Sequence, residues 1–276
     1  MSGRLAILAL VFSSALCAAE ESLTVPFITT PDEVVHRMLA FAQTRPGDLV
    51  ADLGSGDGRI VIAAAQQFGA RGLGIELDAG LVERSRENAA RAGVADRVSF
   101  VQGDVLAADI SAASVVTVYL LPDLMNRLQP RFLQRLQPGT RIVSHAFAMT
   151  SWRPDGRETL HVAKSHPGQG DESSLYLWIV PADVRGLWQG SGQGSGQGSG
   201  QAGATRIRIH QNFQDIELEG RLLGREIASS RASLRGRDIA WEADGSRFEG
   251  RLENGRITGE LIGAQARQPL VLERAR

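Results

Sequence analysis

The sequence is poor in lysine and in cysteine. Lys164 is the only lysine among 276 residues, so arginine carries nearly all of the positive charge, and Cys17 is the only cysteine. A chain with one cysteine forms no internal disulfide, and removal of an N-terminal segment containing Cys17 would exclude thiol chemistry as well. The formal net charge of −1 provides no basic field of the kind that nucleic-acid binding uses. We therefore expect no nucleic-acid partner.

Long apolar runs are also scarce, and the one near the N-terminus is short. Arg4 precedes an apolar run over residues 5–16, which is followed by small residues and then by two acids. This order is typical of a secretory signal peptide cleaved after Ala18 or Ala19, and the run is shorter than the ~20 residues of a transmembrane helix. We expect residues 1–19 to be a signal peptide and the protein to be exported to the periplasm. The alternatives are an uncleaved segment that anchors the protein to a membrane, or a cytoplasmic protein.

Metal-ligand spacing is absent as well. The five histidines form none of the short spacings that zinc sites use. Ser144 and His145 are adjacent, but no acid is placed to complete a catalytic triad with them. We expect no metal site.

What the sequence does contain is a glycine cluster between an apolar run and a helical stretch, within Asp48 to Ile60. The cluster begins with Asp52 and has the form acid-x-G-x-G-x-G. Glycine allows the tight turn and lets a ligand lie against bare backbone amides near the positive end of a helix. A dinucleotide fingerprint would require a small residue where Arg59 stands. The loop instead resembles motif I of the class I S-adenosylmethionine-dependent methyltransferases.

The residues around this loop predict an α/β fold. Apolar runs that alternate with helical stretches indicate a mostly parallel, doubly wound sheet. Thr30, followed by proline and two acids, reads as a capping box that begins the first helix. Two later runs without a helix between them predict an antiparallel hairpin that closes the sheet. The expected strands are residues 49–53, 72–77, 97–102, 114–121, 140–145, 160–163 and 175–180, with a broken helix over 124–136.

The pattern changes after residue 183. Residues 189–201 repeat Gln-Gly-Ser-Gly, and alternating apolar and polar residues follow up to the C-terminus. Such alternation, with Asp244-Gly245 and Asn254-Gly255 where two-residue hairpin turns belong, predicts a small antiparallel β-meander or partly closed barrel. We therefore expect three units after the signal peptide. They are a cofactor-binding domain (20–183), a linker or long hairpin loop (184–203) and a β-domain (204–276), with residues 186–188 as an alternative first strand of the β-domain.

Three acids stand at the carboxyl ends of the strands of the expected parallel sheet, where ligands of such sheets bind. Asp52 is placed to organise the glycine loop and to face the methionine ammonium of the cofactor. Glu76 is placed to accept hydrogen bonds from both ribose hydroxyls. Asp104 is placed to accept from the adenine amine. Alternatively, Asp52 caps a turn, Glu76 is a surface acid and Asp104 caps a helix. Asp57 and Asp78, in the same loops, are expected to be solvated.

Four longer stretches of the sequence narrow the resemblance to one family of methyltransferases. VPFITTPDEVV, DLGSGDGRIVIAAA, YLLP and VSHAF resemble the ATP synthase c-subunit lysine methyltransferase family and its prokaryotic protein-lysine methyltransferase relatives. The resemblance covers about residues 32–181. It implies a Rossmann-like methyltransferase fold with a seven-stranded sheet, S-adenosylmethionine as methyl donor and a protein lysine or another amine as acceptor. The implied cofactor residues are Asp52, Gly54, Ser55, Gly56, Gly58, Glu76, Leu77, Asp104, Val105 and Thr30.

The substrate side of the expected cleft has two candidates. Tyr119 ends the fourth strand, where related amine methyltransferases present backbone carbonyls or an aromatic wall to the nucleophile. His145 ends the fifth strand beside the same cleft, although a lone histidine is often structural. Residues 27–30 are placed to fold over the cofactor as a lid, or to be a plain lead-in to the first helix.

Two other functions remain open at this level. A small-molecule methyltransferase would share every one of these motifs. An exported envelope binding protein would keep the fold as a scaffold without catalysis, and export away from cytosolic S-adenosylmethionine favours it. Oligomeric state is not indicated by the sequence.

Overall fold

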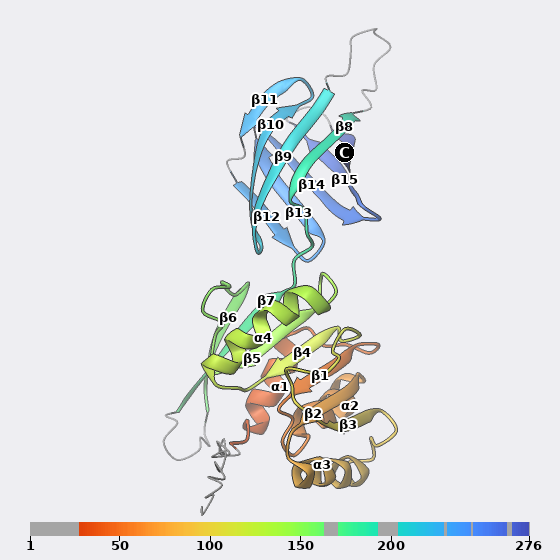
Figure 1. Cartoon of the computed structure of the whole chain (residues 1–276), viewed down its shortest axis with the longest axis vertical. Coiled ribbons are helices and arrows are strands. Elements are labelled where there is room, and N and C mark those ends of the chain that lie inside the picture. Colours follow the sequence, from red (N-terminus) through yellow and green to blue (C-terminus); the bar gives the residue numbers. More distant parts are fainter. Residues whose placement is uncertain are drawn as a thin grey trace, which may run out of the picture.

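The computed structural model describes residues 28–162, 171–192, 204–228, 231–243, 245–263 and 267–275. The expected signal peptide, Phe27, Lys164, His166 and Asp244 lie outside these residues. Two sheets build the described part of the chain, and Figure 1 shows them stacked along the long axis of the molecule. None of the helices in these ranges is long and apolar enough to span a membrane.

The first sheet carries the α/β part of the chain. Its strand order is β3-β2-β1-β4-β5-β7-β6, in which β7 runs antiparallel to its two neighbours and the other neighbouring pairs are parallel. The predicted parallel sheet closed by an antiparallel hairpin is therefore confirmed. Its elements are α1 (Asp32–Phe41), β1 (Leu49–Leu53), α2 (Arg59–Phe68), β2 (Arg71–Glu76), α3 (Ala79–Arg91), β3 (Val98–Gln102), β4 (Val115–Val118), α4 (Pro122–Arg135), β5 (Arg141–His145), β6 (Gly156–His161) and β7 (Glu172–Ile179).

Alternating residues of the central strands build the two faces of this sheet. Val50 and Val115 pack in the core under α1, α2 and α3, whereas their neighbours Ala51 and Val116 pack with α4 on the other face. Side chains of a strand point alternately to opposite faces. A strand buried on both faces therefore reads as the continuous apolar run seen in the sequence.

Three local predictions about these elements are wrong, and the strand expected at residues 160–163 lies earlier in the chain, at Gly156–His161. The first helix has Pro31 as its N-cap with no side-chain cap, because the Thr30 hydroxyl bonds to His145 instead. The fourth strand ends at Val118 and not at residue 121. The helix that follows begins at Pro122, because proline fits the first turn, where its missing N–H is not needed. It then runs without a break to Arg135, with Pro130 inside it.

The second sheet is antiparallel throughout, with nine strands in the order β11-β10-β9-β8-β16-β15-β14-β13-β12. It curls so that Leu234 donates a backbone hydrogen bond to Gln214 across the sheet, and Trp188, Trp241 and Phe248 fill its interior. Its strands are β8 (Gly186–Gly192), β9 (Ala204–Asn212), β10 (Asp215–Leu222), β11 (Arg225–Ala228), β12 (Arg231–Arg235), β13 (Asp238–Ala243), β14 (Ser246–Glu253), β15 (Arg256–Ile262) and β16 (Arg267–Arg274).

Two details of this sheet refine the expectations. Asn254 and Gly255 both have positive φ, 49° and 77°, and join β14 to β15 as the predicted two-residue turn. β8 pairs with β9 and with β16, so the Gln-Gly-Ser-Gly repeat begins within β8 and continues into the connection between two strands of one sheet. The alternative that residues 186–188 begin the β-domain agrees with this pairing.

Candidate active site

A cavity of about 550 Å³ lies at the carboxyl ends of the parallel strands. The loops after β1, β2, β3 and β4 line it, together with residues 28–30, which precede α1. Ten predicted site residues line this cavity: Thr30, Asp52, Gly54, Ser55, Gly56, Glu76, Leu77, Asp104, Val105 and Tyr119. Ten further lining residues were not among the predicted site residues: Ile28, Thr29, Asp57, Arg59, Ile60, Asp78, Leu81, Gly103, Leu120 and Leu124. Of these, Ile28 and Thr29 belong to the segment that was expected to be a lid or a plain lead-in.

The glycine loop forms one wall of the cavity. Gly54, Gly56 and Gly58 have φ of 79°, 53° and 80°, which side-chain-bearing residues rarely adopt. Gly58 does not line the cavity; it is the N-cap of α2, and a Cβ there would lie 2.7 Å from the Phe100 ring. Gly58 therefore serves packing, whereas Gly54 and Gly56 line the cavity.

Asp52 is the buried acid of the cavity. Its side chain is 2% exposed, and its Oδ1 accepts a hydrogen bond of 2.8 Å from the Thr117 hydroxyl. Burial, followed by the nearby charges of Glu76 and Asp57, raises the pKa of Asp52 to about 7, although the bond from Thr117 opposes this rise. No ion pair to Asp52 forms among the described residues. The site therefore holds a carboxyl group that a bound cation would stabilise in its ionised form.

The other two predicted acids shape their own loops. The Glu76 carboxylate accepts backbone N–H bonds from Gly56 at 2.9 Å and from Leu77 and Asp78 at 2.8 and 3.1 Å. It thereby joins the glycine loop to the end of β2. Asp104 accepts from the Leu106 N–H at 2.8 Å. Both acids line the cavity, and their roles toward ribose and adenine remain predictions.

Asp57 and Asp78 differ from each other. Asp78 is exposed and caps α3 by accepting from the Leu81 N–H at 2.9 Å. Asp57 was expected to be solvated, but its carboxylate accepts two hydrogen bonds from the Arg59 guanidinium, at 2.9 and 2.6 Å. The opposite charges two residues apart were the sequence signal for this pair.

The rings of Tyr119 and His145 pack against each other at a tilt of 39°, but only Tyr119 lines the cavity. Their ring centroids are 4.2 Å apart, and His145 is 2% exposed behind Tyr119. Burial lowers the pKa of His145 to about 4, so the ring is neutral near pH 7. A buried neutral ring outside the cavity supports its neighbours and is not placed to exchange protons with a substrate.

Large apolar side chains gather at the cavity. Ile28, Leu77 and Leu121 are 42%, 70% and 54% exposed. The first two line the cavity, and Leu121 follows the lining residue Leu120. Exposed apolar side chains beside a cavity are typical of binding sites.

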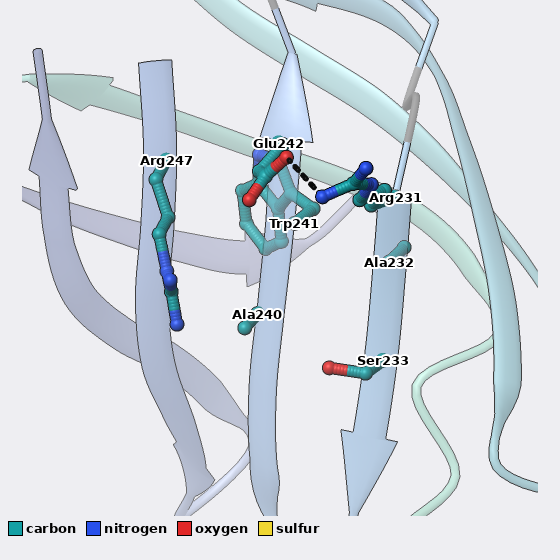
Figure 2. Close-up of a pocket in the computed structure, with 7 residues that line it drawn as sticks. All are labelled: Arg231, Ala232, Ser233, Ala240, Trp241, Glu242 and Arg247. Carbon is teal, nitrogen blue, oxygen red and sulfur yellow. Dashed lines mark ion pairs between the residues drawn. The ribbon is translucent and has the colours of Figure 1, made fainter.

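A second, smaller pocket of about 150 Å³ lies on β12, β13 and β14 (Figure 2). Arg231 lies 3.9 Å from Glu242 across the pocket, and Arg247 pairs with Glu249 at 2.6 Å. The first pair joins the neighbouring strands β12 and β13 and the second lies within β14, and both compensate charges of the pocket. Within the described ranges, no three His, Cys, Asp or Glu side chains cluster to hold a metal ion. The larger cavity is therefore the candidate active site.

Comparisons with known proteins agree with this geometry. The family model described as the ANTKMT methyltransferase domain matches residues 52–156, a match that ends before the second sheet begins. A protein-lysine N-methyltransferase of Saccharolobus islandicus is 38% identical over 157 residues, which are 56% of this chain and 94% of that protein. The ATP synthase c-subunit lysine N-methyltransferase of Xenopus laevis is 33% identical over 155 residues, which are 56% of this chain and 68% of that protein.

A solved structure extends the comparison to bound ligand. It is described as an RNA methyltransferase from Salinibacter ruber in complex with S-adenosylhomocysteine. It is 48% identical, with a TM-score of 0.51, and the match covers 57% of this chain and 96% of that one. The expected fold and methyl donor are thereby confirmed. The chain is an S-adenosylmethionine-dependent methyltransferase and belongs to the family that contains these protein-lysine N-methyltransferases.

Proposed function

We propose that this enzyme methylates the side-chain amine of a protein lysine. The observation that carries the proposal is the charge of the cavity. Five acids line it, namely Asp52, Asp57, Glu76, Asp78 and Asp104, and its one basic lining residue, Arg59, pairs with Asp57. An acidic cavity attracts a cationic donor and a lysine ammonium and repels nucleic-acid phosphates. The names of the archaeal and vertebrate relatives support the same acceptor.

The residues present suit the donor. The buried Asp52 carboxyl, raised in pKa and without a cationic partner among the described residues, fits an ammonium. Gly54 and Gly56 offer backbone at positive φ, where a side chain would be strained. When bound, S-adenosylmethionine supplies an activated methyl group on a sulfonium sulfur: the amine lone pair forms the new C–N bond while the C–S bond breaks, and the sulfur leaves as the thioether S-adenosylhomocysteine.

The protein's own contribution is positioning and exclusion of water. Tyr119, held against the buried His145 ring, forms a wall of the cavity beyond the glycine loop. Leu120 and Leu124 extend that wall with apolar side chains. A lysine amine in such surroundings loses its proton more readily than in water, because desolvation disfavours the ammonium form. No strong base is required.

The test uses the full-length protein, labelled S-adenosylmethionine and lysine-bearing peptides, with mass spectrometry to locate the label. We expect methyllysine in the product, and a loss of about tenfold or more in kcat/KM for Glu76→Ala if its carboxylate holds the donor. Glu87→Ala is the matched control, because Glu87 is an exposed glutamate on α3 outside the cavity. Label found in RNA or in a free small-molecule amine, with none in lysine peptides, contradicts the proposal.

An RNA acceptor is the second candidate, because the solved structure from Salinibacter ruber is described as an RNA methyltransferase. The acidic cavity and the net charge of −1 disfavour it. Labelled transfer RNA and ribosomal RNA, run beside the peptides, separate the two acceptors.

We also propose that residues 1–19 direct export to the periplasm, a proposal that rests on the sequence pattern alone. Fusions after Thr30 to a reporter active only in the periplasm, and to one active only in the cytoplasm, test it. Activity restricted to the periplasmic reporter supports export. Activity restricted to the cytoplasmic reporter contradicts it and places the enzyme beside cytosolic S-adenosylmethionine.

A further inference from the structure

Residues 28–31, here called the lead-in segment, precede α1 and form part of the cavity wall. Ile28, Thr29 and Thr30 all line the cavity. Thr30 is 4% exposed, which is unusual for a polar residue outside regular structure. Both its backbone and its side chain are held, from two different sides.

Arg59 holds the backbone of Thr30. It is the first residue of α2, and its Nη1 donates to the Thr30 carbonyl at 3.0 Å. Its Nε and Nη2 donate to the two oxygens of Asp57, and the Asp57 carbonyl accepts from the Asn88 side chain at 2.8 Å. A guanidinium fixed by a bidentate carboxylate has little freedom left. The glycine loop therefore orients Arg59, and Arg59 ties the lead-in segment to that loop.

His145 holds the side chain of Thr30. Its Nδ1 lies 3.2 Å from the Thr30 hydroxyl, and its Nε2 lies 3.2 Å from the Ser173 hydroxyl on β7. The His145 ring also packs against Tyr119, with 4.2 Å between centroids. Thr30 and Tyr119, two lining residues from distant parts of the chain, therefore share one buried support.

We propose that Arg59 and His145 are positioning residues that hold the lead-in segment as a fixed wall of the acceptor side of the cavity. Through Thr30 and Tyr119 they set the separation between the glycine loop and the substrate-side aromatic ring. The segment is thus a tethered wall and not a freely moving lid. The proposal rests on the proposed function in one respect, namely that Tyr119 faces the acceptor amine.

Thr30→Val tests the His145 tether, because valine keeps the shape of threonine and removes the hydroxyl. We expect the KM for a lysine peptide to rise about three- to tenfold, the size of one lost hydrogen bond, with S-adenosylmethionine affinity by calorimetry within about twofold of wild type. Thr30→Ser keeps the hydroxyl, so its KM should stay near that of wild type. An equal loss of donor affinity would instead show that Thr30 holds the cofactor, and would overturn the proposal.

Arg59→Gln tests the other tether, and Arg37→Gln is its matched control. Arg37 lies on α1 outside the cavity and makes a similar two-bond pair with Glu158, at 2.6 and 2.6 Å. We expect Arg59→Gln to raise the acceptor KM by at least the factor found for Thr30→Val, and Arg37→Gln to leave it unchanged. Equal effects of the two arginine variants would show a general loosening of α1 and overturn the proposal.

Amide hydrogen exchange over the start of α1 separates failure of this inference from failure of the proposed function. If wild type binds the donor but methylates no lysine peptide, the proposed acceptor is wrong, and the tethers are still tested by exchange. Faster exchange at residues 29–35 in Thr30→Val and in Arg59→Gln, but not in Arg37→Gln, supports the tethered wall. Exchange equal to wild type in both cavity variants overturns it.

Discussion

At the scale of single residues, Asp52 has the most perturbed environment in the active site. It is buried at the end of a central strand, and its one hydrogen-bonding side chain, Thr117, is neutral. Its pKa, raised to about 7 chiefly by burial, lies above the value of about 4 for the unfolded chain. Its contribution to stability is therefore full below about pH 4 and is lost as pH rises through about 7 in the ligand-free protein.

The affinity for ligand should change with pH in the direction opposite to folding stability, since the ammonium group of the ligand favours the ionised Asp52 carboxylate. We expect the affinity for S-adenosylhomocysteine to increase between about pH 5.5 and about 7 and to level off above, with proton release on binding. Calorimetry across this range, in buffers of different ionisation enthalpy, measures both quantities. Asp52→Asn should bind more weakly with no such dependence, and methylthioadenosine, which lacks the ammonium, should also be flat. The same pH dependence in Asp52→Asn would contradict this role.

At the scale of elements, Gly74 of β2 leaves the space that the Phe100 ring and the glycine-loop residue Ser55 occupy. A Cβ on Gly74 would lie 2.5 Å from the Phe100 ring and 2.7 Å from the Ser55 hydroxyl. Ser55 belongs to the loop that lines the cavity. The glycine in the strand therefore determines the position of a residue in the neighbouring loop.

Gly74→Ala should couple stability to cofactor affinity. We expect unfolding free energy to fall by about 1–3 kcal/mol from overpacking, together with weaker S-adenosylmethionine binding, because Ser55 must move. Chemical denaturation and calorimetry measure the two effects. Gly93→Ala is the control: its φ is 69° and its Cβ meets nothing within 4 Å. Strain there costs about 1–2 kcal/mol without a change in affinity. Unchanged affinity in Gly74→Ala would refute the coupling.

At the scale of the whole molecule, the second sheet is connected to the first at the amino-terminal ends of the parallel strands, on the side opposite the active site. β7 runs antiparallel to β5, so it leaves the sheet away from the carboxyl ends where the cavity lies (Figure 1). The turn between β9 and β10 docks there. Phe213 stacks on Trp152 at 5.6 Å, and Gln214 accepts from the Trp152 indole at 2.9 Å and donates to the Arg153 carbonyl at 2.6 Å.

Gln214→Ala should weaken this docking without changing catalysis. The variant leaves the buried indole N–H of Trp152 without its acceptor, at a cost of about 1–3 kcal/mol, and we expect the thermal transition to shift down or split in two. Arg153→Ala is the control, since its ion pair with Asp215 is exposed, at 63% and 59%, and such pairs contribute about 1 kcal/mol or less. The kcat should match wild type in both variants. A lower kcat in Gln214→Ala alone would place the second sheet in the catalytic unit.

Local patterns in the sequence were sufficient to predict the first sheet, the glycine loop and the three acids at the ends of its strands. Buried strands, glycines at positive φ and residues at strand ends depend on neighbours a few positions away, and parallel strands bring their carboxyl ends together. Tertiary packing alone decided that the Thr30 hydroxyl bonds to His145, 115 residues away, and does not cap α1. Packing also placed His145 behind Tyr119 and docked the second sheet away from the cavity. These outcomes depend on which buried polar groups meet when distant segments pack, and each such group takes the partner that satisfies it best.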